Sequence, residues 1–464
     1  MKSTRIILAG LVCLFTYALV APAGITGSVP TPEEVNINWR QFEGKTVRAL
    51  FVAHPWQEGI DPYIEEFEQL TGINMEVAVI SEDLFWDKVV IGLSAASPPF
   101  DVFFVSGGAD VYSYYLNNWI EPLDQYIDDP TLTDKDWYDL DDFSSGYIQG
   151  FRIPTAESPL YSIPITSEVY IIFYRKDVFA EQGIDVNELK NIDDWLDVVK
   201  KLTAETDLYG TVVRGGAVGI TDELMAMAFD YWGDLPHETG KAAFFGASWV
   251  PRFTHPRIVQ AFATWAELMK NSPPGVTAFT WYDASTAFAQ GLAATFWFDA
   301  SLFAPSFEDP EESAVAGNVG YAVVPPTTYG HATAFWAWGI GITSKADPNV
   351  KKAAWLFIEW ASSKYGEKFV APNTWGAVRK STWELPEMKQ ILPTEYVDTV
   401  SRSLEIAKYP ALYFPGAQEV IQKALDALHA IYLGTPPEEA MATLQRQAIE
   451  IVEEAGLVPE GLGY

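Results

Sequence analysis

Residues 46–53 read TVRALFVA, and they begin the alternation that decides the fold class. This apolar run predicts a strand, and the amphipathic stretch 61–71 predicts a helix opened by Asp61 and Pro62. Further strands are expected at 73–80 and 101–105, and further helices at 83–96 and 109–118. Strands that alternate with helices at this spacing predict an α/β fold with a parallel sheet covered by helices.

The second half of the chain repeats this α/β character. Amphipathic helices are predicted at 192–203, 256–270, 348–361 and 437–454, with Thr435 as the cap of the last one. Their apolar faces are expected to belong to the core. A chain of 464 residues is long enough for two or more domains or lobes.

The net charge of the chain is strongly negative. Its 62 Asp and Glu residues against 30 Lys and Arg residues give a formal charge of −32. Such a surface repels nucleic acid and anionic membranes, so neither is expected as a partner. Hydrophobic residues make up 48% of the chain, which is typical of a globular protein.

The first 23 residues have the features of a secretory signal peptide. A basic start is followed by the apolar run 6–20 and by Ala21-Pro22-Ala23, so cleavage is expected near Ala23. A retained membrane anchor is the alternative. The single cysteine, Cys13, lies in this segment, and the mature chain is expected to have no thiol. Residues 24–42 are expected to form a flexible leader, and the protein is predicted to be secreted to the periplasm or the outer cell surface.

Signatures of catalysis are scarce. The five histidines form no H-E-x-x-H pattern, and there is no G-x-S-x-G elbow and no phosphate-binding loop. The sequence therefore predicts no enzyme activity, no cofactor and no metal site. A glycosidase remains the alternative, because it needs only one pair of carboxylates among many.

Aromatic and polar residues alternate on two predicted strands. The segment 288–300 reads FAQGLAATFWFDA, and residues two apart on a strand face the same way, so Trp297 and Asp299 are expected to point together. Trp336 and Trp338 are expected to do the same. A Trp face stacks on the C–H face of a sugar, and a carboxylate accepts hydrogen bonds from hydroxyl groups. The alternatives are that the tryptophans are core residues and that Asp299 caps a helix.

Several segments occur in an order that resembles a known family. They are DVFFVSGGADVYSYYLNNWIEPL at 101–123, YSIPITSEVYIIFYRKDVFAEQG at 161–183, the segment 288–300, and those at 319–371 and 432–450. In this order the chain resembles the extracellular sugar-binding proteins of ABC importers, of the maltose- and polyol-binding type. Two departures are Thr295-Phe296, where the family usually has Met, and the missing lipid-attachment cysteine.

The resemblance implies a two-lobe, periplasmic-binding-protein-like α/β fold of type II. Lobe 1 would contain 43–166 and 325–398, and lobe 2 would contain 167–324 and 399–464. Two or three hinge crossings would join them, near 163–169, 323–326 and 392–401. The lobes would close on a sugar or polyol and deliver it to a membrane permease. A monomer is expected.

The resemblance also implies a set of ligand-binding residues. These are Trp56, Glu58, Glu82 and Asp110 at strand ends of lobe 1, Glu168 past the first crossing, Trp281, Trp297 and Asp299 in lobe 2, and Trp336, Trp338, Trp375 and Arg379 on segments that approach the cleft. This acidic and aromatic set favours a neutral sugar or polyol over an anion. Arg379 is the one cation expected there, and which sugar or polyol binds stays open.

Overall fold

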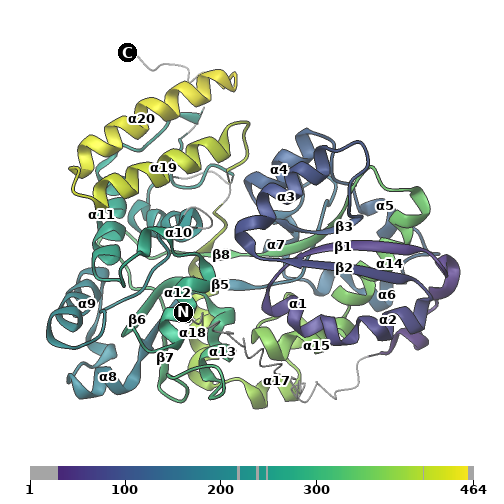
Figure 1. The fold of residues 1–464 in the computed structure, drawn as a ribbon, viewed down its shortest axis with the longest axis horizontal. Helices are drawn as coiled ribbons and strands as arrows, with labels where there is room; N and C mark the ends of the chain where they lie inside the picture. Colours follow the sequence, from purple (N-terminus) through teal and green to yellow (C-terminus); the bar gives the residue numbers. More distant parts are fainter. Residues whose placement is uncertain (1–29, 217–219, 237–239, 247–248, 411, 458–464) are drawn as a thin grey trace, which may run out of the picture.

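The computed structural model describes residues 30–457 except 217–219, 237–239, 247–248 and 411. The predicted signal peptide and the start of the leader lie outside the described residues. The described chain forms two α/β lobes side by side, each built on its own sheet (Figure 1).

The sheet of lobe 1 contains the strands of the opening alternation. Its strand order is β2-β1-β3-β9-β4, with β1 at Thr46–Val52, β2 at Asn74–Ile80, β3 at Val102–Ser106, β4 at Ile163–Pro164 and β9 at Trp338–Ile342. β1 pairs in parallel with β2 and β3, whereas β9 runs antiparallel to β3 and β4. All residues of β3 are buried, as expected for a strand covered by helices on both faces.

Helices surround this sheet on both faces (Figure 1). They are α1 (Pro55–Ile60), α2 (Ile64–Thr71), α3 (Glu82–Ser94), α4 (Ala109–Leu116), α5 (Asp124–Ile127), α6 (Lys135–Tyr138), α7 (Ser145–Gly150), α14 (Pro348–Ser362), α15 (Lys364–Thr374), α16 (Lys380–Trp383) and α17 (Pro386–Ile391). The predicted helix at 61–71 begins only at Ile64. A separate helix, α1, precedes it, because the side chain of His54 accepts a hydrogen bond from the Trp56 N–H and Pro55 occupies the first turn.

The sheet of lobe 2 is organised around one strand. β5 (Glu168–Arg175) is antiparallel to β6 (Thr295–Ala300), β7 (Val319–Ala322) and β8 (Thr333–Trp336), and β8 is parallel to β10 (Ala407–Lys408). Its helices are α8 (Lys176–Glu181), α9 (Ile192–Glu205), α10 (Ile220–Trp232), α11 (Pro256–Lys270), α12 (Trp281–Ala289), α13 (Ala304–Glu308), α18 (Thr394–Ile406), α19 (Ala417–Tyr432) and α20 (Pro437–Glu454). Pro436, not the predicted Thr435, occupies the N-cap of α20.

The chain crosses between the two lobes at three places. The first crossing, between β4 and β5, falls within the predicted segment 163–169. The second lies at Ala337, between β8 and β9, so its predicted place near 323–326 is wrong. The two prolines at 325–326 belong to a loop from which the chain returns as β8, which still pairs with β5. Residues 325–336 therefore belong with lobe 2.

The third crossing precedes α18. This helix packs on β5 and β7, so residues from Thr394 onward belong with lobe 2, earlier than the predicted boundary at 399.

The described part of the leader is more ordered than predicted. It forms two 3-10 helices, Pro32–Glu34 and Trp39–Phe42, and the Trp39 side chain is buried. The ring of Trp39 lies edge-on to Trp137, with 6.0 Å between the ring centroids, and its Nε1 donates to the Pro32 carbonyl at 2.9 Å. This burial anchors residues 32–42 to lobe 1. Among the described residues, no helix has the length and apolar character that a membrane crossing requires.

Candidate functional site

A small cavity lies between the two lobes. Glu82 and Trp86 of α3 and Trp338 of β9 line it from lobe 1. Its remaining lining residues are Glu168, Tyr170, Arg214, Trp281, Ala300 and Trp336. The volume of about 20 Å³ has room for roughly one water molecule, so a larger ligand requires the lobes to separate.

Tryptophan rings form much of the cavity wall. Trp86 and Trp338 stack with 5.3 Å between their ring centroids and 25° between their planes. Trp336 lies edge-on to Trp338 at 6.5 Å. Both Trp336 and Trp338 face the cavity, as the sequence predicts, although the chain changes sheet between them. Trp86 was not predicted, because it lies inside a helix and not at a strand end.

The side chain of Trp281, which lines the cavity, is positioned by a hydrogen bond to Asp299. Its Nε1 donates to Asp299 Oδ1 at 3.1 Å, and the Ala300 N–H donates to the same oxygen at 2.7 Å. Asp299 is fully buried and does not line the cavity, contrary to its predicted role as a direct ligand contact. Burial raises the pKa of Asp299 to about 7, against the opposing charge of Arg214.

A β-bulge turns Trp297 away from the cavity. Ile171 pairs with Asp299 and the next residue, Ile172, pairs with Trp297, so Phe298 is the extra residue, and its φ of 51° lies in the left-handed region. The bulge places Trp297 and Asp299 on opposite faces of β6. Trp297 is fully buried and packs edge-on against Trp195 of α9 at 5.9 Å. Its prediction as a ligand contact is therefore wrong, and it is a core residue.

Arg214 provides the cation of the cavity. Its Nη1 donates to Glu223 at 2.6 Å, and its carbonyl accepts a hydrogen bond from Trp265 Nε1 at 3.2 Å. Burial opposes its charge, but the carboxylates of Glu223, Glu82 and Asp299 outweigh burial and raise its pKa. No sequence pattern points to Arg214, because it lies in an irregular segment without a recognisable strand end.

Arg379, the predicted cation, lies instead inside lobe 1. Its Nε donates to the Ser362 carbonyl at 2.8 Å, its Nη1 donates to the Asp139 carbonyl at 3.1 Å, and its guanidinium lies 3.9 Å from the centre of the Phe143 ring. Arg379 is fully buried there, so it joins segments of lobe 1 and does not reach the cavity.

Four further predicted residues do not line the cavity. Trp56 is buried in the core of lobe 1 against Phe51 and Phe104, because α1 turns its side chain inward. Trp375 follows α15 as its C-cap and packs on Tyr396. Glu58 is exposed on α1.

Asp110, the fourth of these residues, accepts hydrogen bonds from Ser106 Oγ at 2.6 Å and from Gln418 Nε2 at 2.7 Å. Burial raises the pKa of Asp110 to about 6. Because Gln418 lies on α19 of lobe 2, Asp110 contacts the other lobe and not the cavity.

His54 connects the lobes beside the cavity. Its Nδ1 accepts the Trp56 N–H, so Nε2 carries the proton and donates to Glu168 Oε1 at 3.3 Å. The His54 ring also stacks on Trp281 with 5.2 Å between centroids. Within the described residues, no group of three or more His, Cys, Asp or Glu side chains could hold a metal ion.

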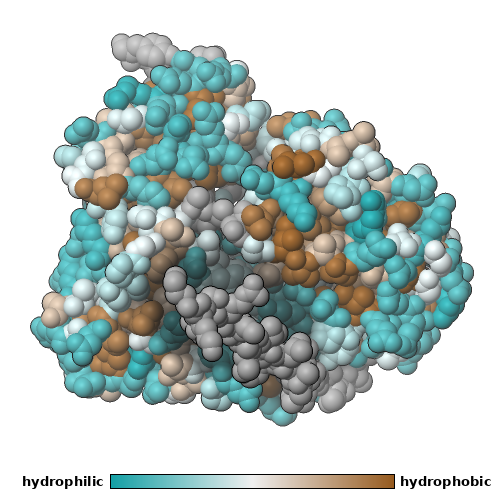
Figure 2. Space-filling view, viewed as in Figure 1, coloured by the Kyte–Doolittle hydropathy of each residue, from teal (hydrophilic) through white to brown (hydrophobic). Residues whose placement is uncertain are grey.

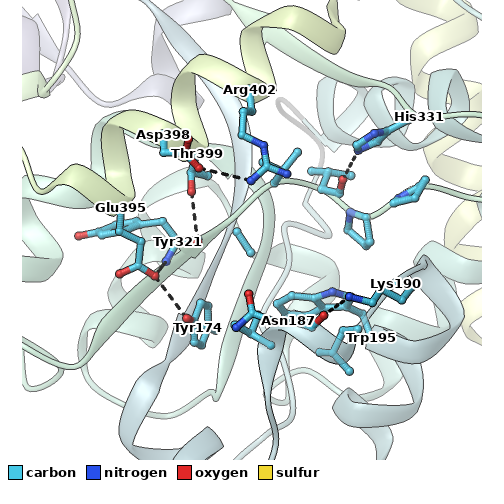
Figure 3. A pocket seen from close by; sticks show the side chains of 17 residues that line it. Tyr174, Asn187, Lys190, Trp195, Tyr321, His331, Glu395, Asp398, Thr399 and Arg402 are labelled. Atoms are coloured by element: carbon cyan, nitrogen blue, oxygen red, sulfur yellow. Dashed lines mark hydrogen bonds and ion pairs between the residues drawn. The ribbon is translucent and has the colours of Figure 1, made fainter.

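A larger pocket of about 430 Å³ lies elsewhere on lobe 2 (Figure 3). It contains none of the predicted site residues. Its polar side chains bond to one another or to the backbone: Tyr174 donates to Glu395, Thr399 to the Tyr321 carbonyl, and Arg402 to Asp398. These groups are occupied by their own neighbours, so the interlobe cavity is the better candidate for ligand binding.

The chain is similar to known proteins over most of its length. The model of the family "Bacterial extracellular solute-binding protein" matches residues 53–368. An erythritol/L-threitol-binding protein of Mycolicibacterium smegmatis is 26% identical over 75% of this chain and 73% of its own. A mannitol-binding protein of Pseudomonas aeruginosa is 26% identical over 64% of each chain.

Solved structures of solute-binding proteins share the two-lobe fold. The Agrobacterium radiobacter ABC transporter solute-binding protein in complex with ribitol has a TM-score of 0.76 at 22% identity, covering 88% of this chain and 99% of its own. Maltose-bound MalE3 of T. maritima has a TM-score of 0.75 at 20% identity, covering 87% and 99%. With the family model matching more than half of its length, the chain belongs to the bacterial extracellular solute-binding proteins.

Proposed function

We propose that this protein captures a sugar or polyol between its lobes and delivers it to the membrane permease of an ABC importer, without chemical conversion. The observation that carries the proposal is the cavity wall, in which Trp86, Trp281, Trp336 and Trp338 surround Glu82, Glu168 and Arg214. Tryptophan faces stack on the C–H groups of a polyol, and carboxylates and a guanidinium bond its hydroxyl groups.

The charge of the cavity favours a neutral ligand. Glu82 and Glu168 line it beside a single guanidinium, which Glu223 already pairs with. An anionic ligand would meet these carboxylates, whereas hydroxyl groups can donate to them. Two relatives are an erythritol/L-threitol-binding and a mannitol-binding protein, which also supports a neutral polyol as the ligand.

The binding residues that we propose combine predicted and unpredicted side chains. Glu82, Glu168, Trp281, Trp336 and Trp338 are retained from the sequence prediction. Trp86, Tyr170 and Arg214 are added because they line the same cavity. Asp299 acts as a positioning residue for Trp281.

Secretion and permease docking belong to the same proposal. Residues 1–23 would direct export as a cleaved signal peptide, and the mature protein would act as a monomer in the periplasm or at the outer cell surface. Apolar side chains gather over α3 and β2 of lobe 1 (Figure 2), where Val79, Leu84 and Ile91 are exposed. This surface supports a protein contact beside the cavity, which a permease would provide.

The proposal is tested by screening erythritol, ribitol, mannitol and maltose by thermal shift and calorimetry. We expect at least one of them to raise the melting temperature in a concentration-dependent way. Chromatography of the recovered ligand should show it unchanged. Hydrolysis of a glycoside, abolished by Glu82→Gln or Glu168→Gln, would favour a glycosidase instead, and the absence of stabilisation by every compound would contradict the proposal.

A further inference from the structure

Interlobe contacts lie on two opposite sides of the cavity. α12 faces α1 on the lower side in Figure 1, and α19 faces α4 on the upper side. On the lower side, Tyr282 Oη of α12 donates to the Ala53 carbonyl at 2.9 Å. Beside it, His54 donates to Glu168 and stacks on Trp281.

The upper side is closed by a second set of contacts. Gln418 Nε2 of α19 donates to Asp110 Oδ1 of α4 at 2.7 Å. Tyr409 packs directly on Gly107, since a Cβ added there would lie 1.1 Å from the Tyr409 hydroxyl oxygen. The rings of Tyr112 and Tyr413 approach to 5.8 Å across the same boundary.

The crossing strands close a third side. The Trp338 N–H of β9 donates to Thr166 Oγ1 at 2.9 Å, in the segment between β4 and β5. The ligand space is therefore bounded above, below and at the hinge, and it can grow only if the lobes move apart.

We infer that these contacts make the protein selective for short acyclic polyols over longer polyols and disaccharides. This inference rests on the proposed function. A short ligand fits with little separation of the lobes, so that the contacts of Tyr282 and Gln418 can form around it. A longer ligand holds the lobes further apart and forfeits these hydrogen bonds, which lowers its affinity.

Calorimetry with erythritol, ribitol, mannitol and maltose tests the inference. The wild-type protein should bind erythritol or ribitol most tightly, then mannitol, with maltose at least about tenfold weaker than the tightest ligand, equivalent to 1.4 kcal/mol. Maltose binding as tightly as the short polyols would overturn the inference and leave the proposed function intact. Binding of none of the four would overturn the proposed function itself.

Variants that remove an interlobe contact test the cause of the selectivity. Gln418→Ala and Tyr282→Phe should each reduce the preference for erythritol over mannitol by at least about threefold. Each variant lacks an interlobe hydrogen bond that forms around the short ligand but not around the longer one. Gln422→Ala, one turn along α19, and Tyr329→Phe, whose hydroxyl donates to Gln260, are the matched controls and should leave the preference unchanged. If Gln418→Ala and Tyr282→Phe weaken the binding of all ligands by the same factor, the inference is overturned. Circular dichroism verifies that each variant is folded.

Discussion

Asp299 does not line the interlobe cavity, but it bonds to a residue that does. It lies beneath the cavity and orients the indole of Trp281 through one hydrogen bond. The same oxygen accepts the Ala300 N–H. Because Trp281 also stacks on His54 of the other lobe, its orientation bears on both ligand contact and lobe closure.

Asp299→Asn should weaken polyol binding by about 1 kcal/mol, since the amide oxygen accepts the indole N–H less strongly than a carboxylate does. The effect should pass through Trp281. We therefore expect a double-mutant cycle with Trp281→Phe, measured by calorimetry, to be non-additive. The double mutant should lose less binding free energy than the two single mutants lose in sum. Additive losses would show that Asp299 acts on the ligand independently of Trp281.

Glu359 is a buried carboxylate of α14, and no side chain among the described residues pairs with it. Burial raises its pKa well above the ordinary value. A raised pKa means that the native state prefers the protonated form, so stability is full at low pH and is lost as pH rises. Glu359→Gln should gain stability relative to wild type between pH 5 and 8, by up to about 1.4 kcal/mol per pH unit, in urea unfolding. Parallel pH profiles of the two proteins would contradict this.

The predicted residues that line the cavity share one property: they lie at or near the ends of regular elements. Glu82 begins α3, Glu168 begins β5 and Trp281 begins α12. Arg214 could not be found in this way, because it follows no periodic element. The prediction for Arg379 is wrong, because a segment that approaches a cleft does not reveal which way its side chain turns.

At the level of elements, β6 shows where the period-two rule fails. Residues two apart face the same side of a strand only while each residue pairs with one residue of the neighbouring strand. At the bulge, Phe298 is an extra residue without such a partner on β5. The sequence carries no glycine at this position to indicate left-handed backbone. Elements with strong periodicity, such as α11, kept their predicted bounds of Pro256–Lys270.

Trp297→Phe tests the corrected role of Trp297. Its ring fills the space between β6 and α9, so the smaller ring should lower the free energy of unfolding by about 1–3 kcal/mol. Ligand affinity in the folded protein should change by less than about twofold. Calorimetry and urea unfolding measure the two quantities, and a loss of affinity without a loss of stability would restore Trp297 to the site.

Gly107→Ala tests the packing of α4 and its preceding turn against lobe 2. A methyl group there would displace the Tyr409 ring, and with it the upper contact between the lobes. We expect ligand affinity to fall at least about tenfold with little change in the melting temperature of the free protein. Gly146→Ala is the control, because its Cβ would meet Phe335 only at 3.8 Å. Equal effects of the two substitutions would contradict the role of Gly107 in closure.

On the scale of the whole molecule, the two-lobe architecture was predictable from the order of segments, but the place of the second crossing was not. The second crossing depends on whether the loop after β7 returns to pair with β5, which is a long-range choice. Because the chain crosses at Ala337, Trp336 and Trp338 lie on different sheets, on either side of the hinge. We therefore expect ligand contact with this pair to depend on the relative position of the lobes.

This dependence predicts that ligand shifts the protein from open to closed forms. The ligand contacts that we propose with α3 of one lobe and with Arg214 and Trp281 of the other would exist together only in the closed form. Moving the population from mostly open to mostly closed requires about 5.5 kcal/mol of differential binding, which a few desolvated hydrogen bonds and stacked rings can supply.

The distance between the lobes can be measured with two spin labels in a Cys13→Ser background. The labels are attached at Lys88→Cys and Gln422→Cys, which are exposed on α3 and α19. Saturating erythritol should shorten and narrow the distance distribution measured by double electron–electron resonance. An unchanged distribution with saturated binding would show that the ligand binds without closure.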